Sequence, residues 1–250
     1  MKSLIITVAG MSSRFNKDTK ENVLKCLYYE DTPANSLLSL QVHKTYDLVD
    51  EIIVVGGYKY EDLERFIRTE MKDVNHKMKL VYNDHYSDYG SGYSLLKGIE
   101  MVSEKADEIT FIEGDLFFDT DSVEQIINSK KDVISVNNEP ILSNKAVALY
   151  FDAQNYPHYI YDTSHSCLEI HEPFTAIYNS GQMWKFMNPN RVHEICQYLT
   201  PEQVQGTNLE IIQYYFGVFE ISQLDIVRVN LWFNCNTVSD YRDSLKSLNL

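Results

Sequence analysis

The residues best suited to chemistry follow a short apolar segment at the start of the chain. Residues Leu4–Val8 lead directly into the turn Ala9–Phe15 (AGMSSRF), and Lys25 lies a little further on. A glycine lets backbone N–H groups approach a ligand without an intervening Cβ, and the side chains of Arg14 and Lys25 can neutralise phosphate oxygens. The segment therefore favours binding of a nucleoside triphosphate, although the same residue types also form ordinary turns. It matches neither the P-loop nor the dinucleotide-binding pattern.

A second signal is a carboxylate that follows another apolar segment. Residues Ile109–Ile112 lead into Glu113-Gly114-Asp115. A carboxylate at the carboxyl end of a strand suits Mg²⁺ beside nucleotide phosphates, but Asp115 could equally cap a turn or the next helix. If both apolar segments are parallel strands, the turn and Asp115 emerge at the same edge of the sheet.

Composition narrows the possible functions. The chain has 250 residues, 44% of them hydrophobic, and a formal net charge of −14, which allows a sizeable core and argues against nucleic acid or an anionic membrane as the main partner. The four cysteines form no C-x-x-C pair and the seven histidines form no zinc motif, so a zinc site and a disulfide framework are disfavoured. No signal peptide or membrane span is visible, and we expect a soluble cytoplasmic protein.

Strand-like and helix-like segments alternate in the first half, which is typical of an α/β fold with parallel strands. The expected strands are 4–8, 51–55, 79–82, 108–112 and 132–136, and the expected helices are 34–46, 60–71, 92–102 and 122–128. Beyond Asn137 the segments 146–151, 158–162 and 175–178 predict an antiparallel extension. Helices are expected at 182–199, 201–216 and 238–248, with a last strand at 225–229. No linker or repeat divides the chain, which favours a single domain.

Taken together, these segments resemble the nucleotidyltransferases of the glycosyltransferase-A-like fold, especially small cytidylyltransferases similar to bacterial phosphocholine cytidylyltransferase. The resemblance is carried by Val8–Phe15, Lys25, Gly114-Asp115 and Trp232–Tyr241. It implies a mostly parallel central sheet flanked by helices, as in nucleotide-diphospho-sugar transferases, with a smaller mixed α/β acceptor lobe. In these terms residues 1–137 form the nucleotide-binding part, 138–224 the acceptor-binding part, and 225–250 the closing strand and helix.

The resemblance also implies roles for individual residues. Arg14 and Lys25 take the positions of the family's cationic pair, although Leu24 stands where a proline usually precedes the lysine. Lys25 would orient the acceptor or the α-phosphate, and Arg14 would stabilise the leaving pyrophosphate. Backbone N–H groups that would wrap the triphosphate belong to Ala9, Gly10, Met11 and Ser12, and the candidates for base and ribose contacts are Asn83, Ser91 and Gly92.

One departure from the family concerns the metal. Asp115 is the expected Mg²⁺ ligand, and its partner position, which is usually an aspartate, reads Asn236 within Asn234-Cys235-Asn236-Thr237. An amide oxygen can ligate Mg²⁺ but lacks the charge that helps to hold a divalent ion. Metal affinity could be weaker, or a nearby carboxylate could compensate. Asp240 could be that carboxylate or a residue of the helix start.

The implied reaction is transfer of CMP from CTP to a small phosphorylated or phosphonate acceptor, with release of pyrophosphate, for decoration of a surface polysaccharide or lipid. Tyr178, Glu210 and Trp232 are candidate acceptor contacts, because aromatic faces and carboxylates suit an ammonium group such as choline. Those residues could instead simply fill the core. The alternatives are a sugar-1-phosphate nucleotidyltransferase and a catalytically idle nucleotide-binding domain. The oligomeric state stays open, a homodimer included.

Overall fold

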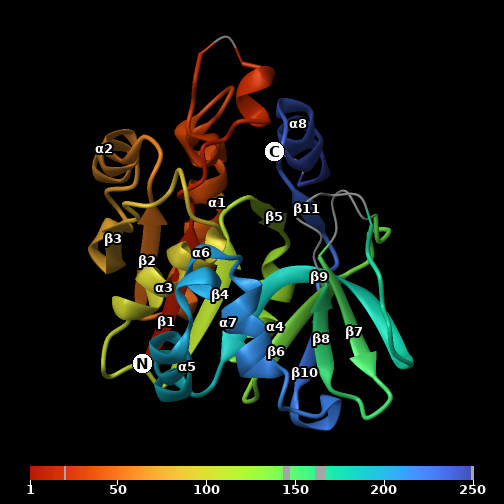
Figure 1. Cartoon of the computed structure of the whole chain (residues 1–250). Helices are drawn as coiled ribbons and strands as arrows, with labels where there is room; N and C mark the ends of the chain where they lie inside the picture. Colours follow the sequence, from red (N-terminus) through yellow and green to blue (C-terminus); the bar gives the residue numbers. More distant parts are fainter. Residues whose placement is uncertain (20, 143–146, 161–166, 249–250) are drawn as a thin grey trace.

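The chain folds into a broad sheet with helices on both faces (Figure 1). The computed structural model describes residues 1–19, 21–142, 147–160 and 167–248. Within these ranges nine strands form one sheet, in the order β10-β6-β9-β4-β1-β2-β3, with β7 and β8 attached beside β9. The strands of this sheet are β1 (Lys2–Thr7), β2 (Glu51–Gly56), β3 (Met78–Tyr82), β4 (Glu108–Glu113), β6 (Val133–Asn137), β7 (Ala148–Asp152), β8 (Pro157–Ile160), β9 (Phe174–Phe186) and β10 (Asp225–Arg228).

The helices cover both faces of the sheet (Figure 1). They are α1 (Leu37–Thr45), α2 (Tyr60–Glu70), α3 (Ser91–Glu100), α4 (Thr120–Asn128), α5 (Pro189–Tyr198), α6 (Pro201–Gln205), α7 (Leu209–Phe216) and α8 (Val238–Ser247). Strand alternation divides the core in two, because Leu4 and Ile6 face one side and Ile5 the other. Helices α1, α2, α4 and α8 pack on the first side, and α3, α5 and α7 on the second.

Parallel pairing brings the two chemical segments to one edge. Strand β1 lies between β2 and β4, parallel to both, and Thr7 at its end is opposite Val55 and Glu113. The turn after β1 and the turn after β4 therefore start side by side, as the sequence predicts. The expected α/β fold with a mostly parallel sheet is confirmed.

The predicted helix over 182–199 is wrong in its first part. Residues Gln182–Phe186 belong to β9, which runs antiparallel between β4 and β6. These positions are buried on both faces of the sheet, so their pairing overrides a helix-like pattern. Helix α5 starts only at Pro189, after Asn188, whose side chain accepts a hydrogen bond from the backbone of Arg191.

Other helix bounds also differ. The predicted helix over 201–216 is two helices, because α6 ends before Gly206 and α7 starts at Leu209. The first predicted helix starts at Leu37 rather than Ala34, since residues Pro33–Asn35 form a 3-10 turn and Ser36 caps α1. Residue 146, the first of the predicted strand 146–151, and residues 161–162, the last of the predicted strand 158–162, lie outside the described residues.

A short two-stranded sheet was not predicted at all. Strand β5 (Leu116–Phe118) pairs antiparallel with β11 (Trp232–Asn234), Asn234 opposite Leu116. Each strand has only three residues, too few for a recognisable alternation. This pairing matters because it carries the chain near the C-terminus back to the turn after β4.

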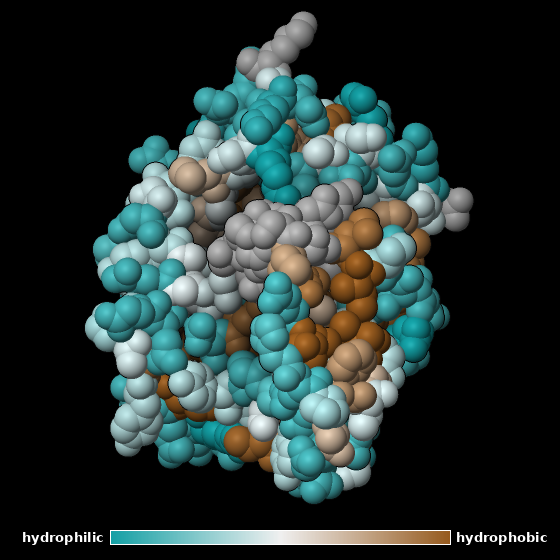
Figure 2. Space-filling view, turned by 45° about the vertical axis from the view of Figure 1, so that its right-hand side comes forward, coloured by the Kyte–Doolittle hydropathy of each residue, from teal (hydrophilic) through white to brown (hydrophobic). Residues whose placement is uncertain are grey.

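The outer surface is largely hydrophilic on the face shown in Figure 2, although apolar side chains gather in one area of it. Among the described residues, Phe174 and Ile177 of β9 are exposed. None of the helices in the described part of the chain is long and apolar enough to cross a membrane.

A buried ion pair joins β9, β4 and the end of α4. The side chain of Lys185, on β9, is 1% exposed, and its ammonium lies 2.8 Å from Oε2 of Glu108 on β4. It also donates to the carbonyl oxygens of Ile127 and Ser129, both at 2.7 Å, at the C-terminal end of α4. Burial lowers the pKa of Lys185, while Glu108 opposes that shift. The lysine thus ties β9, β4 and α4 together.

We expect Lys185→Met to lower the free energy of unfolding by about 3 kcal/mol, because the buried Glu108 carboxylate loses its partner at 2.8 Å and keeps only the Lys2 ammonium, 3.7 Å from its Oε1. Urea unfolding followed by circular dichroism measures this change. The control is Lys131→Met, which removes an exposed ion pair with Asp225 at 3.6 Å and should cost at most about 1 kcal/mol. Equal losses in the two variants would contradict the assigned role of Lys185.

Candidate active site

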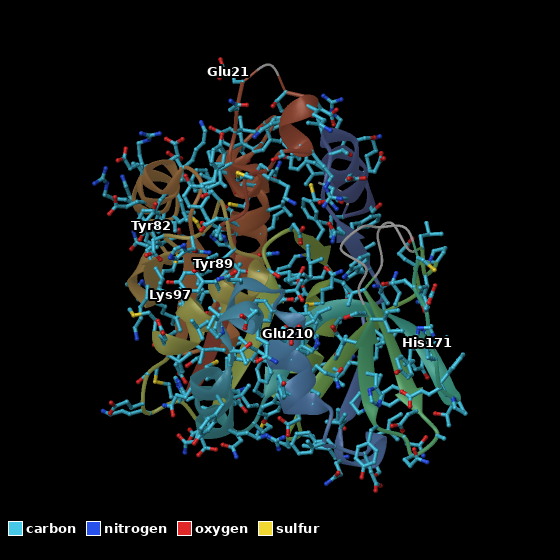
Figure 3. All side chains as sticks on the ribbon, in the orientation of Figure 1. Glu21, Tyr82, Tyr89, Lys97, His171 and Glu210 are labelled. Carbon is cyan, nitrogen blue, oxygen red and sulfur yellow. The ribbon has the colours of Figure 1, made fainter. Side chains whose placement is uncertain are left out.

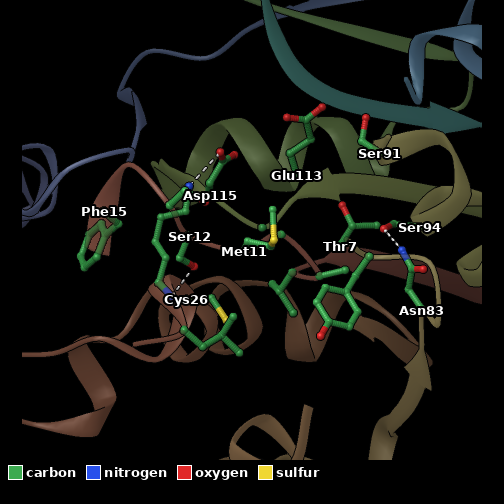
Figure 4. Close-up of a pocket in the computed structure, with 18 of the residues that line it drawn as sticks. Thr7, Met11, Ser12, Phe15, Cys26, Asn83, Ser91, Ser94, Glu113 and Asp115 are labelled. Carbon is green, nitrogen blue, oxygen red and sulfur yellow. Dashed lines mark hydrogen bonds and ion pairs between the residues drawn. The ribbon is translucent and has the colours of Figure 1, made fainter. Parts of the chain in front are cut away.

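A cavity of about 420 Å³ opens at the edge where β1 and β4 end. Figure 4 shows its walls. Ten of the residues singled out from the sequence line it together: Ala9, Gly10, Met11, Ser12, Arg14, Lys25, Asn83, Ser91, Asp115 and Asn236. The structure thus brings the phosphate-binding and metal-binding candidates to one place, and their roles remain predictions.

The turn after β1 presents backbone donors to the cavity. The N–H groups of Gly10, Met11 and Ser12 donate to no described residue. Ser12 adopts the left-handed conformation, with φ of 56°. Successive free N–H groups around such a residue form a concave anion site. A Cβ built on Gly10 meets nothing within 4 Å, so the space above this residue is open to a ligand.

Ser12 also holds Lys25 in place. Its hydroxyl oxygen accepts a hydrogen bond from the backbone N–H of Lys25 at 3.0 Å (Figure 4). The ammonium of Lys25 lies 3.1 Å from Oδ2 of Asp115 and 3.4 Å from Oδ1 of Asn236. The side chain of Arg14 is exposed and makes no hydrogen bond or ion pair with any described residue, so its guanidinium can meet an incoming anion.

Asp115 and Asn236 meet because β5 pairs with β11. Beyond that pair, the N–H of Cys235 donates to the carbonyl oxygen of Asp115 at 2.8 Å. The side chain of Asp240 accepts from the N–H groups of Asn236 and Thr237, at 2.9 and 2.8 Å, and completes the capping box of α8. Asp240 is therefore a helix-start residue, one of the two possibilities that the sequence left open.

The oxygen atoms at this point fit an oxygen-ligated cation. Oδ1 of Asp115 is buried and accepts no hydrogen bond from any described residue. Its other oxygen and Oδ1 of Asn236 converge on the Lys25 ammonium. No group of three His, Cys, Asp or Glu side chains that could hold a metal exists among the described residues. Mg²⁺ typically takes one or two protein carboxylates and completes its shell with phosphates and water. The two side chains suit that arrangement.

Glu113 was not among the predicted site residues, although it lies only two positions before Asp115. Its Oε1 accepts a hydrogen bond from Nδ2 of Asn208 at 2.7 Å. Burial and then the negative charge of Asp115 raise the pKa of Glu113 to about 8. Both Glu113 and Asn208 line the cavity. The signal for Glu113 was its place at the end of β4, whereas Asn208 reaches the site only through the packing of α7.

The far wall is built where two loops touch. The start of α3 and the residue before it lie against the end of α6 and the residue after it: Gly90 and Gly92 donate backbone hydrogen bonds to Gln205 and Gly206, at 2.8 and 3.1 Å. A Cβ on Gly90 would come within 2.3 Å of the carbonyl oxygen of Gly206. Gly92 does not line the cavity, and this close packing is the contact that it makes.

Two other residues of this wall also have structural partners. Nδ2 of Asn83 donates to Ser94 at 2.8 Å (Figure 4), and its Oδ1 accepts from the N–H of His85 at 2.8 Å. The hydroxyl oxygen of Ser91 accepts from the N–H of Asn208 at 3.0 Å. Asn83 and Ser91 thus shape the wall as well as facing the cavity.

Two tyrosines of the same loop, Tyr86 and Tyr89, line the cavity and were not predicted. Tyr86 lies near Tyr58 and Tyr82, with ring centroids 6.5 and 6.4 Å away, and Tyr89 stacks on His85 at 4.1 Å. The only signal in the sequence was the density of tyrosines between positions 82 and 93.

The three predicted acceptor contacts do not line this cavity. Glu210 lies in the first turn of α7 (Figure 3). Tyr178 packs edge-on against Phe151, with ring centroids 6.2 Å apart. Nε1 of Trp232 donates to the carbonyl oxygen of Gly181 at 2.9 Å. Their part in acceptor binding remains a prediction, now without support from a shared cavity.

Three solved structures of similar fold have names that specify a nucleotide. The inositol-1-phosphate CTP transferase from T. maritima has a TM-score of 0.71 at 15% identity, over 98% of this chain and 96% of that one. The CTP:phosphocholine cytidylyltransferase from Streptococcus pneumoniae has a TM-score of 0.66 at 16% identity, over 99% of each chain. A UDP-glucose pyrophosphorylase complexed with UDP-glucose has a TM-score of 0.69 at 11% identity, over 100% of this chain and 98% of that one. The nucleotidyltransferase fold expected from the sequence is confirmed.

Sequence comparison identifies the family to which the chain belongs. No curated protein matches the sequence significantly. A family model described as "Domain of unknown function (DUF6564)" matches residues 21–248. This range includes Lys25, Asp115 and Asn236 and leaves out the turn after β1. The chain belongs to the DUF6564 family.

Proposed function

We propose that this protein is a nucleotidyltransferase that transfers CMP from CTP to a small phosphate- or phosphonate-bearing acceptor and releases pyrophosphate. The observation that carries the proposal is the turn after β1. Its free N–H groups face the same cavity as the Lys25–Asp115 pair and the unpaired Arg14. Donors for a polyphosphate and oxygen ligands for a cation are thus combined at one sheet edge, where α/β folds bind ligands.

The chemistry needs no covalent intermediate. An oxygen of the acceptor phosphate attacks the α-phosphorus of CTP, a new P–O bond forms, and the bond to the bridging oxygen of pyrophosphate breaks. The acceptor oxygen is already anionic near neutral pH, so positioning and charge neutralisation supply the catalysis. Lys25 would neutralise the α-phosphate and Arg14 the leaving pyrophosphate. The N–H groups of Gly10, Met11 and Ser12 would bind the remaining phosphate oxygens.

Asp115 and Asn236 are the residues that would hold Mg²⁺. The ion would supply positive charge beside the triphosphate. Lys25 pairs with both of these side chains in the structure. Its long, flexible side chain lets the ammonium turn from them towards phosphate while Ser12 keeps its backbone in place.

The choice of CTP and of a phosphocholine-like acceptor rests on the sequence resemblance and on the two similar structures whose names specify CTP. The similar UDP-glucose pyrophosphorylase makes a sugar-1-phosphate the second candidate acceptor. We assign residues 1–137 to nucleotide binding and 138–224 to the acceptor side. Use in decorating a surface polymer or lipid belongs to the same proposal.

A pyrophosphate-release assay tests the reaction. The purified protein is incubated with Mg²⁺ and each of CTP, UTP, ATP and GTP, against phosphocholine, phosphoethanolamine, aminoethylphosphonate and sugar 1-phosphates. We expect turnover with CTP and an amine-bearing phosphate or phosphonate. Turnover only with sugar phosphates would overturn the acceptor assignment. Nucleotide binding without turnover for any pair would instead indicate an idle nucleotide-binding domain.

Replacing Gly10 tests the cavity floor. We expect Gly10→Ala to fold normally, because the added Cβ meets no atom within 4 Å. The methyl group would nevertheless occupy ligand space. Overpacking of this kind costs roughly 1–3 kcal/mol, or about 5- to 150-fold in CTP affinity. Isothermal titration calorimetry measures the affinity, and thermal unfolding checks the fold.

The matched glycine is Gly114, where a Cβ would come within 2.5 Å of the carbonyl oxygen of Thr7. Gly114→Ala should therefore lower the melting temperature, unlike Gly10→Ala. Unchanged CTP affinity in Gly10→Ala would count against the position assigned to the triphosphate.

Replacing Lys25 tests catalysis. We expect Lys25→Met to lower kcat by about 100- to 1,000-fold, as for loss of a group that stabilises transition-state charge. Steady-state kinetics with the active substrate pair measures this loss. Lys246→Met, on the exposed side of α8, is the control and should keep full activity. A fall in kcat of less than about tenfold for Lys25→Met would contradict the role of Lys25.

A further inference from the structure

A strained residue lies in the middle of β9. Gln182 is 2% exposed and has a φ of 55°, a left-handed conformation that costs a non-glycine residue energy. The pairing of β9 with β6 shifts register at this point, between Ile134–Trp184 and Val136–Ser180. Such bulges near a site re-aim a side chain.

The bulge is held by buried hydroxyl groups. The hydroxyl of Ser135, on β6, donates to the carbonyl oxygen of Met183 at 2.7 Å and accepts from the N–H of Met183 at 3.0 Å. The hydroxyl oxygen of Ser180 accepts from the N–H of Gln182 at 3.1 Å. Three hydrogen bonds thus hold the backbone of Gln182 and Met183 in the bulged conformation.

From Gln182 a chain of amides leads to the cavity. Nδ2 of Asn234 donates to Oε1 of Gln182 at 3.2 Å, and Nδ2 of Asn236 donates to Oδ1 of Asn234 at 2.5 Å. At the end of the chain, Oδ1 of Asn236 accepts from the ammonium of Lys25 at 3.4 Å. We call these three side chains, Gln182, Asn234 and Asn236, the amide relay.

We propose that Gln182 is a positioning residue that acts through Asn234. It would make Asn236 present its oxygen, rather than its NH₂ group, to the Lys25 ammonium or to a divalent cation bound in the cavity. The inference deepens the proposed function and rests on it for its consequence in catalysis. Gln182 itself does not line the cavity. Its effect reaches the site only through the direction of the hydrogen bonds.

Direction matters because an amide has two different ends. If the Asn236 amide turned over, its NH₂ group would point at the Lys25 ammonium and at any divalent ion there, where only an oxygen can serve as a ligand. An aspartate would have two equivalent oxygens and would need no such control. The relay therefore explains how an asparagine can serve in this place, with the strain at Gln182 as its cost.

The test removes the acceptor at the start of the relay with Gln182→Met. Mn²⁺ is the probe metal, and its binding to the protein with CTP is followed by EPR. We expect affinity for Mn²⁺ to fall about tenfold or more, as for loss of a residue that orients a metal ligand. Gln182→Gly serves as a second variant, because glycine adopts the left-handed conformation freely and removes the same amide. A relay effect is the same in both variants.

The control for loss of an internal amide is Gln213→Met. Gln213, on α7, accepts from the N–H of Tyr159 at 2.8 Å and donates to the carbonyl oxygen of Pro157 at 3.1 Å, away from the cavity. It should leave Mn²⁺ affinity unchanged. Equal losses of affinity in Gln182→Met and Gln213→Met would show a general loss of stability and overturn the proposal.

A double-mutant cycle distinguishes an effect of Gln182 on the orientation of the Asn236 amide from a general effect on the stability of the site. In an Asn236→Asp background the ligand has two equivalent oxygens, so Gln182→Met should change Mn²⁺ affinity by at most about twofold. The same tenfold loss in both backgrounds would overturn the proposal.

A readout without nucleotide distinguishes this inference from the proposed function. In ¹⁵N spectra of the protein alone, the side-chain amide protons of Asn236 should exchange with solvent more slowly than in Gln182→Met. Slow exchange in both proteins would contradict the relay. If slow exchange is lost in the variant but no nucleotide binds to either protein, the relay stands and the proposed function fails.

Discussion

The parallel pairing of β1 with β4 is the constraint on which the site depends. It sets Thr7 opposite Glu113. As a result, the turn with the free N–H groups and the turn that carries the Asp115 carboxylate lie side by side. Both strands are buried in the middle of the sheet, with Leu4, Ile5 and Ile112 fully enclosed. Sliding one strand by a single residue would exchange the side chains that pack in the two halves of the core, so the packing of both halves fixes the geometry of the cavity.

Much of this edge could be predicted from the sequence, because the signals were local. A run of apolar residues followed by Gly10 and another followed by Gly114-Asp115 identify two strand ends. Parallel pairing of the two strands then places both ends at the same edge of the sheet. The second half was harder. Gln182–Phe186 has residues compatible with a helix, and only its place between β4 and β6 makes it a strand. The amide relay starts from a bulge in this strand, at Gln182, and the periodicity of the sequence does not predict a bulge.

The same distinction separates the roles of individual residues. Gly92 and Asn83 were predicted as ligand contacts because of the family resemblance. The structure also gives them packing and hydrogen-bonding partners that would suffice to require these residue types. Glu113 and Asn208 show the reverse case, since neither stood out in the sequence and their hydrogen bond lies at the cavity. Local sequence patterns do not predict long-range contacts such as the one between α7 and the end of β4.

The hydrogen bond from Lys25 to Ser12 has a consequence for how this fold can vary. Two further hydrogen bonds, between the side chain of Asn16 and the backbone of Val23, at 3.1 and 2.8 Å, close the same segment at its base. Lys25 is thus held by Ser12 on one side and by the Asn16–Val23 pair on the other. Lys17 and Asn22, which lie between these contacts, border a second, more open hollow beside the turn. Substitutions at these two positions can add contacts at the hollow while the hydrogen bonds that hold Lys25 stay in place.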